Sequence, residues 1–206
     1  MLPTLDERLW RLPFDLQPLR DAVWQQRARG VNIHPDGTVE VAPMPWVGPE
    51  AYAFVLYPPV VPAWLATFAE RSGRRIPDAY AAVLGASNGC FAFGLALFGL
   101  PPSLQARPRV DRRALEPLDL LAANHYWTND YRGAADEFHF GGRTWSDTEN
   151  VGYFLTGDAV YRCRRKSGEV LQEWPSLREL LAQELPAAEF RERDRWTGRT
   201  WPWEVS

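Results

Sequence analysis

Apolar residues recur every three or four positions in several stretches of the chain, and this spacing predicts amphipathic helices. In the first two stretches they are Leu16, Leu19, Val23 and Trp24, and then Trp64, Leu65, Phe68 and Ala69. Gly30 and Gly73 stand where a terminal glycine would end these helices. A third helix is predicted from Pro77, whose missing N–H suits a first turn, to Asn88-Gly89, which favours a left-handed ending. Its inward positions are Tyr80, Val83 and Leu84.

Two more helices are predicted in the second half of the chain. Residues 118–127 form the first of them. Ser176 and Glu179 have the spacing of a capping box, in which each side chain bonds the other residue's backbone amide. The inner face of the helix that follows is Leu177, Leu180, Leu181 and Leu185.

Alternating patterns predict strands around turn-forming residues. Residues 31–33 and 39–41 flank Pro35-Asp36-Gly37 and predict a small hairpin. Residues 90–97 predict one strand, with a bulky face formed by Phe91, Phe93, Leu95 and Leu97.

Four further strands are predicted near the C-terminal end, at residues 138–140, 151–155, 159–163 and 170–174. Their predicted connections are Gly141-Gly142, Thr156-Gly157-Asp158 and Lys166-Ser167-Gly168-Glu169. Short strands joined by such turns are typical of an antiparallel meander. The sequence therefore predicts an α+β fold with a mainly antiparallel sheet flanked by helices.

The chain is expected to form one domain with extensions, since it has 206 residues and 46% hydrophobic residues. Residues 1–60 are predicted to be a helix, a hairpin and a proline-studded arm (43–62) packed on the main domain, which spans 61–185. Residues 186–206 are predicted to be a tail with Trp196, Trp201 and Trp203. These tryptophans either seal the N-terminal helix onto the domain or form an exposed interface.

Charge and cysteine content narrow the class of protein. A net charge of −3 disfavours a dedicated nucleic-acid binder, so the arginines at 107, 109, 112 and 113 are interpreted as solvated surface. Cys90 and Cys163 have no metal-site or disulfide-scaffold spacing, and Cys90 is expected to be a packing residue. We find no signal-peptide pattern and no stretch long enough to span a membrane, and we expect a soluble, cytoplasmic protein.

The candidates for catalysis are His125 and His139, with Asp130, Asp136 and Glu137 beside them. Histidines with carboxylates can bind zinc or transfer protons, but this spacing matches no ligand motif. We interpret both histidines as structural. The chain also contains no GxSxG, Walker A or GxGxxG motif. We therefore predict no catalytic residue, metal or cofactor.

Several of these segments, taken in order, resemble the SUKH superfamily. The first are Ile76-Pro77-x-x-Tyr80-x-x-x-Leu84, Asn88-Gly89 and Leu97-Phe98-Gly99-Leu100. The later ones are Asn124, Phe138-His139-Phe140-Gly141, Gly152-Tyr153-Phe154, Ala159-Val160-Tyr161, and Trp174 with Ser176-Leu177 and Leu180-Leu181. The resemblance covers about Val61 to Leu185. The family's acidic Gly-Asp-Gly turn is replaced by Gly141-Gly142-Arg143.

The resemblance implies a protein-binding domain and not an enzyme. The superfamily includes yeast Smi/Knr cell-wall regulators and bacterial immunity proteins, which typically neutralise a toxin encoded beside them, often a nuclease. The leading hypothesis is an immunity protein that binds its cognate toxin and contacts neither nucleic acid nor membrane. A regulatory scaffold of the yeast type is the alternative, and an enzyme that uses His125 and His139 is a third.

The partner surface is expected in the acidic, aromatic stretch after Asn124. Tyrosine and tryptophan often anchor interfaces, and acidic residues would attract a basic nuclease cleft. The predicted partner-binding residues are Tyr126, Trp127, Asp130, Tyr131, Asp136, Glu137, Trp145, Asp147, Glu149 and Tyr153.

Overall fold

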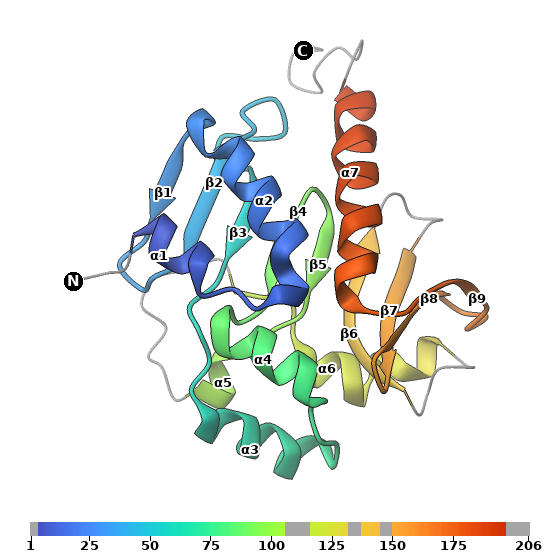
Figure 1. Ribbon diagram of the computed structural model, residues 1–206. Coiled ribbons are helices and arrows are strands. Elements are labelled where there is room, and N and C mark those ends of the chain that lie inside the picture. The colour runs from blue at the N-terminus through green and yellow to red at the C-terminus, as the bar shows by residue number, and fades with distance from the viewer. Residues whose placement is uncertain (1–3, 106–115, 132–136, 145–149, 197–206) are drawn as a thin grey trace.

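The protein folds around one large antiparallel sheet (Figure 1). The structure is a computed structural model, and it describes residues 4–105, 116–131, 137–144 and 150–196. Within these ranges nine strands lie in the sheet in the same order as in the sequence, and all neighbours are antiparallel. The predicted α+β fold with a mainly antiparallel sheet is confirmed.

The helices and strands of the described residues have the following bounds. The strands are β1 Val31–Ile33, β2 Val39–Pro43, β3 Tyr52–Leu56, β4 Cys90–Ala92, β5 Leu95–Leu97, β6 Phe138–Thr144, β7 Asn150–Thr156, β8 Ala159–Arg164 and β9 Val170–Trp174. The α-helices are α1 Leu5–Trp10, α2 Gln17–Gln26, α3 Pro62–Ser72, α4 Asp78–Ala86, α5 Pro102–Gln105, α6 Leu120–His125 and α7 Leu177–Trp196. Short 3-10 helices are η1 Phe14–Leu16, η2 Arg27–Arg29 and η3 Trp127–Asp130.

The main core lies between one face of the sheet and the helices packed on it. Figure 1 shows α2 and α7 side by side over this face, with α4 near the end of β5. Because side chains alternate along a strand, every second strand residue points into this core. Its large members from the sheet are Val41, Phe54, Leu56, Leu97, Phe140 and Tyr153. The predicted inner residues of α7, from Leu177 to Leu185, are all buried in it, as predicted.

Three buried polar side chains satisfy backbone groups where the ladder between strands ends. The Tyr80 hydroxyl lies 2.6 Å from the carbonyl oxygen of Phe98 and 2.9 Å from that of Phe140. The Asn88 amide bonds both the N–H and the carbonyl of Leu100, and Asn124 does the same for His139. Since an unpaired buried backbone group is costly, these residues extend the ladder without another strand.

Gly99 is required by the close approach of two backbone segments. A Cβ atom at this position would lie 2.2 Å from the carbonyl oxygen of Asn88, far inside van der Waals contact. The Ile76-to-Gly99 segment is therefore a tightly packed structural unit, and all of its polar contacts described here are internal to the fold.

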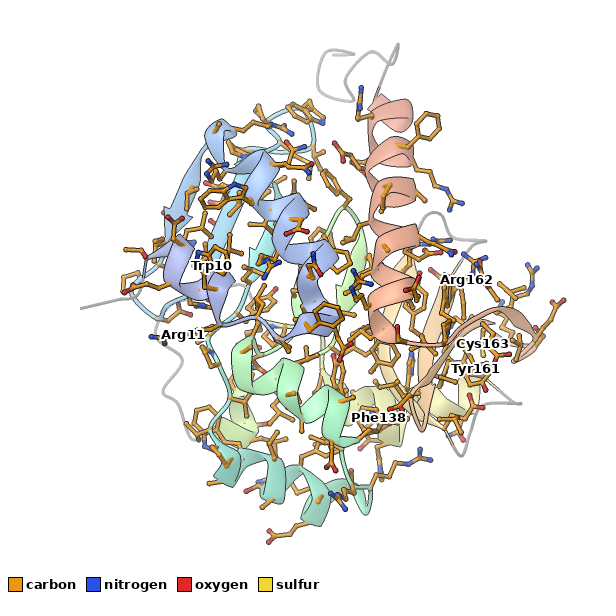
Figure 2. The ribbon with its side chains drawn as sticks, in the orientation of Figure 1. Trp10, Arg11, Phe138, Tyr161, Arg162 and Cys163 are labelled. Carbon is orange, nitrogen blue, oxygen red and sulfur yellow. The ribbon has the colours of Figure 1, made fainter. Side chains whose placement is uncertain are left out.

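A buried charge cluster joins α7 to the sheet. Glu184 accepts hydrogen bonds from Arg143, from Arg162 at 2.7 Å and from the Tyr153 hydroxyl at 2.7 Å. Arg162, which is labelled in Figure 2, also lies over the Trp174 ring, 5.8 Å from its centroid. A buried carboxylate held by two guanidinium groups is tolerated because each charge has a partner within hydrogen-bond distance.

The single strand predicted at residues 90–97 is wrong, because this segment is a hairpin. β4 and β5 are joined by Phe93 and Gly94, which both have positive φ, 47° and 84°. Two positive φ angles in a two-residue loop match the twist of the flanking strands. The hairpin puts Phe91 and Leu95 on opposite faces, so the predicted bulky face does not exist.

Three other predicted segments differ from the structure. Residues 43–62 contain β3, which pairs with β2 and β4, so the predicted arm contributes an inner strand of the sheet. Gly141-Gly142 lie inside β6 and are not a turn. α7 continues past residue 185 to Trp196, although it contains Pro186. Proline has no N–H to bond the carbonyl of Ala182 one turn earlier, but both residues lie on the exposed side of the helix, where water can bond that carbonyl. Residues 201 and 203 lie outside the described residues.

Tyr80→Phe should lower the free energy of unfolding by about 1–2 kcal/mol, because it removes a buried hydroxyl from two backbone carbonyls. Urea denaturation followed by circular dichroism measures this change. Tyr126→Phe is the control, since Tyr126 is 66% exposed. Equal stability of the two variants would show that the Tyr80 hydroxyl does not stabilise the strand ends.

Glu184→Gln should lower the free energy of unfolding by about 3–5 kcal/mol, because Arg143 and Arg162 then lose their shared buried carboxylate. Thermal and urea unfolding measure the loss. Glu169→Gln removes an exposed carboxylate that pairs with Arg164 at 3.0 Å and should change stability by less than about 1 kcal/mol. A loss no larger than that of the control would contradict the anchoring role of Glu184.

Candidate functional site

The second face of the sheet points away from α2 and α7, and small side chains lie at its centre. We call it the open face. Successive cross-strand partners run across it in one row, namely Val55, Phe91, Ala96, Gly142, Gly152 and Cys163. Two glycines and an alanine in this row contribute almost no side-chain volume to the middle of the face.

Aromatic rings pack directly against these glycines. A Cβ atom at Gly142 would lie 3.1 Å from the Phe98 ring, and one at Gly152 would lie 3.0 Å from the Tyr131 ring. A Cβ at Gly152 would also lie 2.8 Å from the Nε2 atom of His139. The glycines therefore allow the rings to approach the backbone more closely than any side chain would permit.

His139 is held inside this aromatic group. Its ring stacks on Phe154 with centroids 4.4 Å apart, and Phe98 and Tyr131 meet it edge-on at 5.2 and 5.1 Å. Burial lowers the pKa of His139 to about 4. The imidazole is therefore neutral at neutral pH and serves as part of the packed wall.

A hollow of about 910 Å³ lies over the open face and continues around the end of the sheet, where Arg143 of β6 and Glu192 of α7 also line it. Its volume is near the upper end of the range of roughly 300–1,000 Å³ that is usual for ligand pockets. Its apolar and aromatic lining includes Val55, Tyr57, Phe91, Phe93, Phe98, Tyr131 and Val151. Burial raises the pKa of Tyr57, so its hydroxyl stays protonated and can donate a hydrogen bond.

Charged residues also border the hollow, and most of them are acidic. The carboxylates are Glu50, Glu116, Asp130 and Glu192, and the cations are Arg143 and Arg165. Arg143 bonds Glu184, and Arg165 bonds Asp130 at 2.8 Å. With four carboxylates and two guanidinium groups in the lining, acidic residues outnumber basic ones at the border.

The predicted partner-binding residues lie in different environments. Asp130 and Tyr131 line the hollow, and Tyr126 is exposed on the surface. Glu137 is half-buried, and burial raises the pKa of its carboxyl. The side chain of Trp127 and residues 136, 145, 147 and 149 lie outside the described part of the structure.

Tyr153 is wrong as a partner-binding residue. It is fully buried, its hydroxyl donates to Glu184 of α7, and it does not line the hollow. Alternation along β7 explains the error, because the neighbouring Phe154 is the residue that belongs to the open face.

The two histidines differ in environment. His125 is exposed on α6 beside Tyr126, whereas His139 is enclosed by aromatic rings. In residues 4–105, 116–131, 137–144 and 150–196, no group of three or more His, Cys, Asp or Glu residues could hold a metal ion.

The cysteines are buried thiols. Burial raises the pKa of Cys90 to about 12 and that of Cys163, labelled in Figure 2, to about 11. A thiol with so high a pKa is a poor nucleophile at neutral pH, in keeping with the packing role expected for Cys90.

Several residues of the hollow were not predicted from the sequence. Val55 lies on the strand hidden in the proline-studded arm, and Phe91 was placed on the wrong face by the missed hairpin. Gly142 was interpreted as part of a turn. The signal that could have revealed it is a glycine inside an otherwise apolar strand, which often marks close packing against the backbone.

No protein-family model, curated protein or solved structure matches this chain. Among the helices of the described residues, none combines the length and the apolar character needed to cross a lipid bilayer.

The pKa of His139 generates a pH prediction. In the unfolded chain the imidazole gains a proton below its ordinary pKa of 6.5, whereas in the folded protein it does so only near 4. The unfolded chain therefore binds this proton first, and the free energy of unfolding decreases as the pH falls from 6.5 to 4. The loss is on the order of 3 kcal/mol.

Urea unfolding at several pH values between 7 and 4 measures this slope. His139→Phe keeps an aromatic ring and should flatten the slope. His125→Gln removes an exposed imidazole and should leave the slope in place. An unchanged slope in His139→Phe would mean that His139 does not control acid stability.

Proposed function

We propose that the protein is a non-enzymatic protein-binding domain that holds part of a partner protein in the hollow of its open face. The observation that carries this proposal is the combination of an aromatic lining with a mainly acidic border. We further propose that it is an immunity protein that neutralises a cognate bacterial toxin by direct binding. The resemblance to the SUKH superfamily supports this second step.

The groups at the hollow favour binding over catalysis. The imidazole of His139 has a pKa near 4, so it is a weak proton acceptor at neutral pH, and three aromatic rings contact it. Asp130 is engaged by Arg165. Packed rings and an ion pair suit a surface that keeps its shape while a partner docks.

The lining and the border would have separate roles in binding. Aromatic residues in a recessed, apolar site are the residue type that most often carries binding energy. Acidic residues around it would speed the approach of a basic partner and orient it. A nuclease is a suitable partner, because an enzyme that acts on nucleic acid carries a basic cleft.

The test is a binding measurement between this protein and the product of the neighbouring gene. The double variant Glu50→Lys/Glu116→Lys should weaken binding by roughly 10-fold or more, mainly through a slower association rate at low salt. Glu70→Lys is the matched control, because Glu70 is exposed on α3, away from the hollow. Biolayer interferometry at two salt concentrations separates the rate effects.

Protection of cells is the second measurement. Expression of the wild type should allow growth when the neighbouring toxin is induced, and the double variant should protect less well. Absence of a toxin-like neighbour, together with failure to protect any cell, would overturn the immunity function. A broad set of bound proteins would then favour a regulatory scaffold.

A further inference from the structure

A second surface, on the helical side of the molecule, exposes three large aromatic side chains. Trp10 at the end of α1 is 74% exposed (Figure 2), Phe14 in η1 is 69% exposed and Trp24 in α2 is 40% exposed. These residues are not needed for the core, because α1 and α2 bury Leu5, Leu9, Leu19 and Val23 instead.

Each aromatic ring of this surface lies beside an arginine. The guanidinium carbon of Arg20 is 5.3 Å from the centroid of the Trp10 ring, that of Arg178 is 4.6 Å from Phe14, and that of Arg27 is 3.5 Å from Trp24. Such contacts hold long side chains in place before any partner arrives. Exposed tryptophan with arginine is also the composition that distinguishes interface centres from ordinary surface.

Hydrogen bonds join two of these pairs, and the third lies next to them on α2. Arg178 donates to Gln17, Gln17 donates to Asp21, and Asp21 also accepts from Arg20. Trp24 follows Arg20 by four positions, so the two share one side of α2. We call this surface the aromatic–arginine face.

The position of α1 is set by a buried arginine. Arg8 donates to the carbonyl oxygens of Gly37 and Tyr57, both at 2.5 Å. Because these carbonyls lie beside β2 and β3, Trp10 is presented by a helix anchored to the sheet and not by a loose terminus. An anchored ring can join an interface without a large loss of conformational entropy.

The charges around the aromatic–arginine face are balanced. In α1, η1, α2, η2 and the first turn of α7, the arginines outside the core are Arg11, Arg20, Arg27, Arg29 and Arg178, and the carboxylates are Asp6, Glu7, Asp15, Asp21 and Glu179. A surface that binds a strongly acidic or basic partner would carry a surplus of the opposite charge. A balanced surface is complementary to itself, which is the property that a two-fold symmetric interface requires.

We propose that the aromatic–arginine face is the interface of a homodimer, formed by the same residues of two copies related by a two-fold axis. This dimer leaves the hollow of each copy free, because no residue of the aromatic–arginine face lines the hollow. The inference is independent of the proposed function, and the dimer would present two hollows.

Sedimentation equilibrium over a range of protein concentrations tests the dimer. The wild type should show a concentration-dependent dimer, and Trp10→Glu/Phe14→Glu should weaken association by at least about 10-fold, since it places like charges opposite each other. Phe190→Glu is the matched control, because Phe190 is also 69% exposed but lies on α7 outside this face. A monomeric wild type at all concentrations, or equal effects of both variants, would overturn the proposal.

Disulfide cross-linking locates the interface without relying on a loss of association. Under mild oxidation, whichever of Trp10→Cys, Phe14→Cys and Trp24→Cys lies next to the two-fold axis should form a cross-linked dimer, whereas Phe190→Cys should not. The background is low because Cys90 and Cys163 are both buried. Cross-linking at position 190 as strong as the strongest at positions 10, 14 and 24, or none at those three positions, would overturn the assignment, even if the protein is dimeric.

Discussion

The sheet has α2 and α7 on only one of its faces, and this constraint determines the chemistry of both faces. Toward the helices, alternate strand residues form the apolar core. On the same side, Glu184 forms buried ion pairs with Arg143 and Arg162. The cluster joins the last helix to the second half of the sheet, while Arg8 joins the first helix to the first half. A meander of consecutive strands is thus anchored at both ends.

Away from α2 and α7, the open face is covered by its own aromatic side chains. Phe98 and Tyr131 lie against the backbone at Gly142 and Gly152, and His139 completes the layer as a neutral ring. The hollow is the space beside this layer, above the row of small residues. Packing that stabilises the sheet therefore also produces a shaped, aromatic surface. The proposed binding function uses this surface and needs no reactive group.

Local signals in the sequence predicted much of the fold. Gly73 does end α3 in a left-handed conformation, Ser176 does accept a hydrogen bond from the Glu179 amide, and the four C-terminal strands form the predicted meander. The failures occur where tertiary contacts override a local preference. Phe93 adopts a positive φ that phenylalanine alone disfavours, and the proline-rich stretch around β3 is held as a strand by its neighbours.

The fold class, most helix ends and the inner face of α7 could be predicted without the structure, because they depend on periodicity and on residues a few positions apart. The residues of the hollow could be identified only in three dimensions, because Val55, Phe91, Gly142 and Val151 come from four strands and meet through register. A shift of one residue in register moves a side chain to the other face, as the exchange of Tyr153 for Phe154 illustrates. The same holds for the aromatic–arginine face, whose arginines come from α2, η2 and α7.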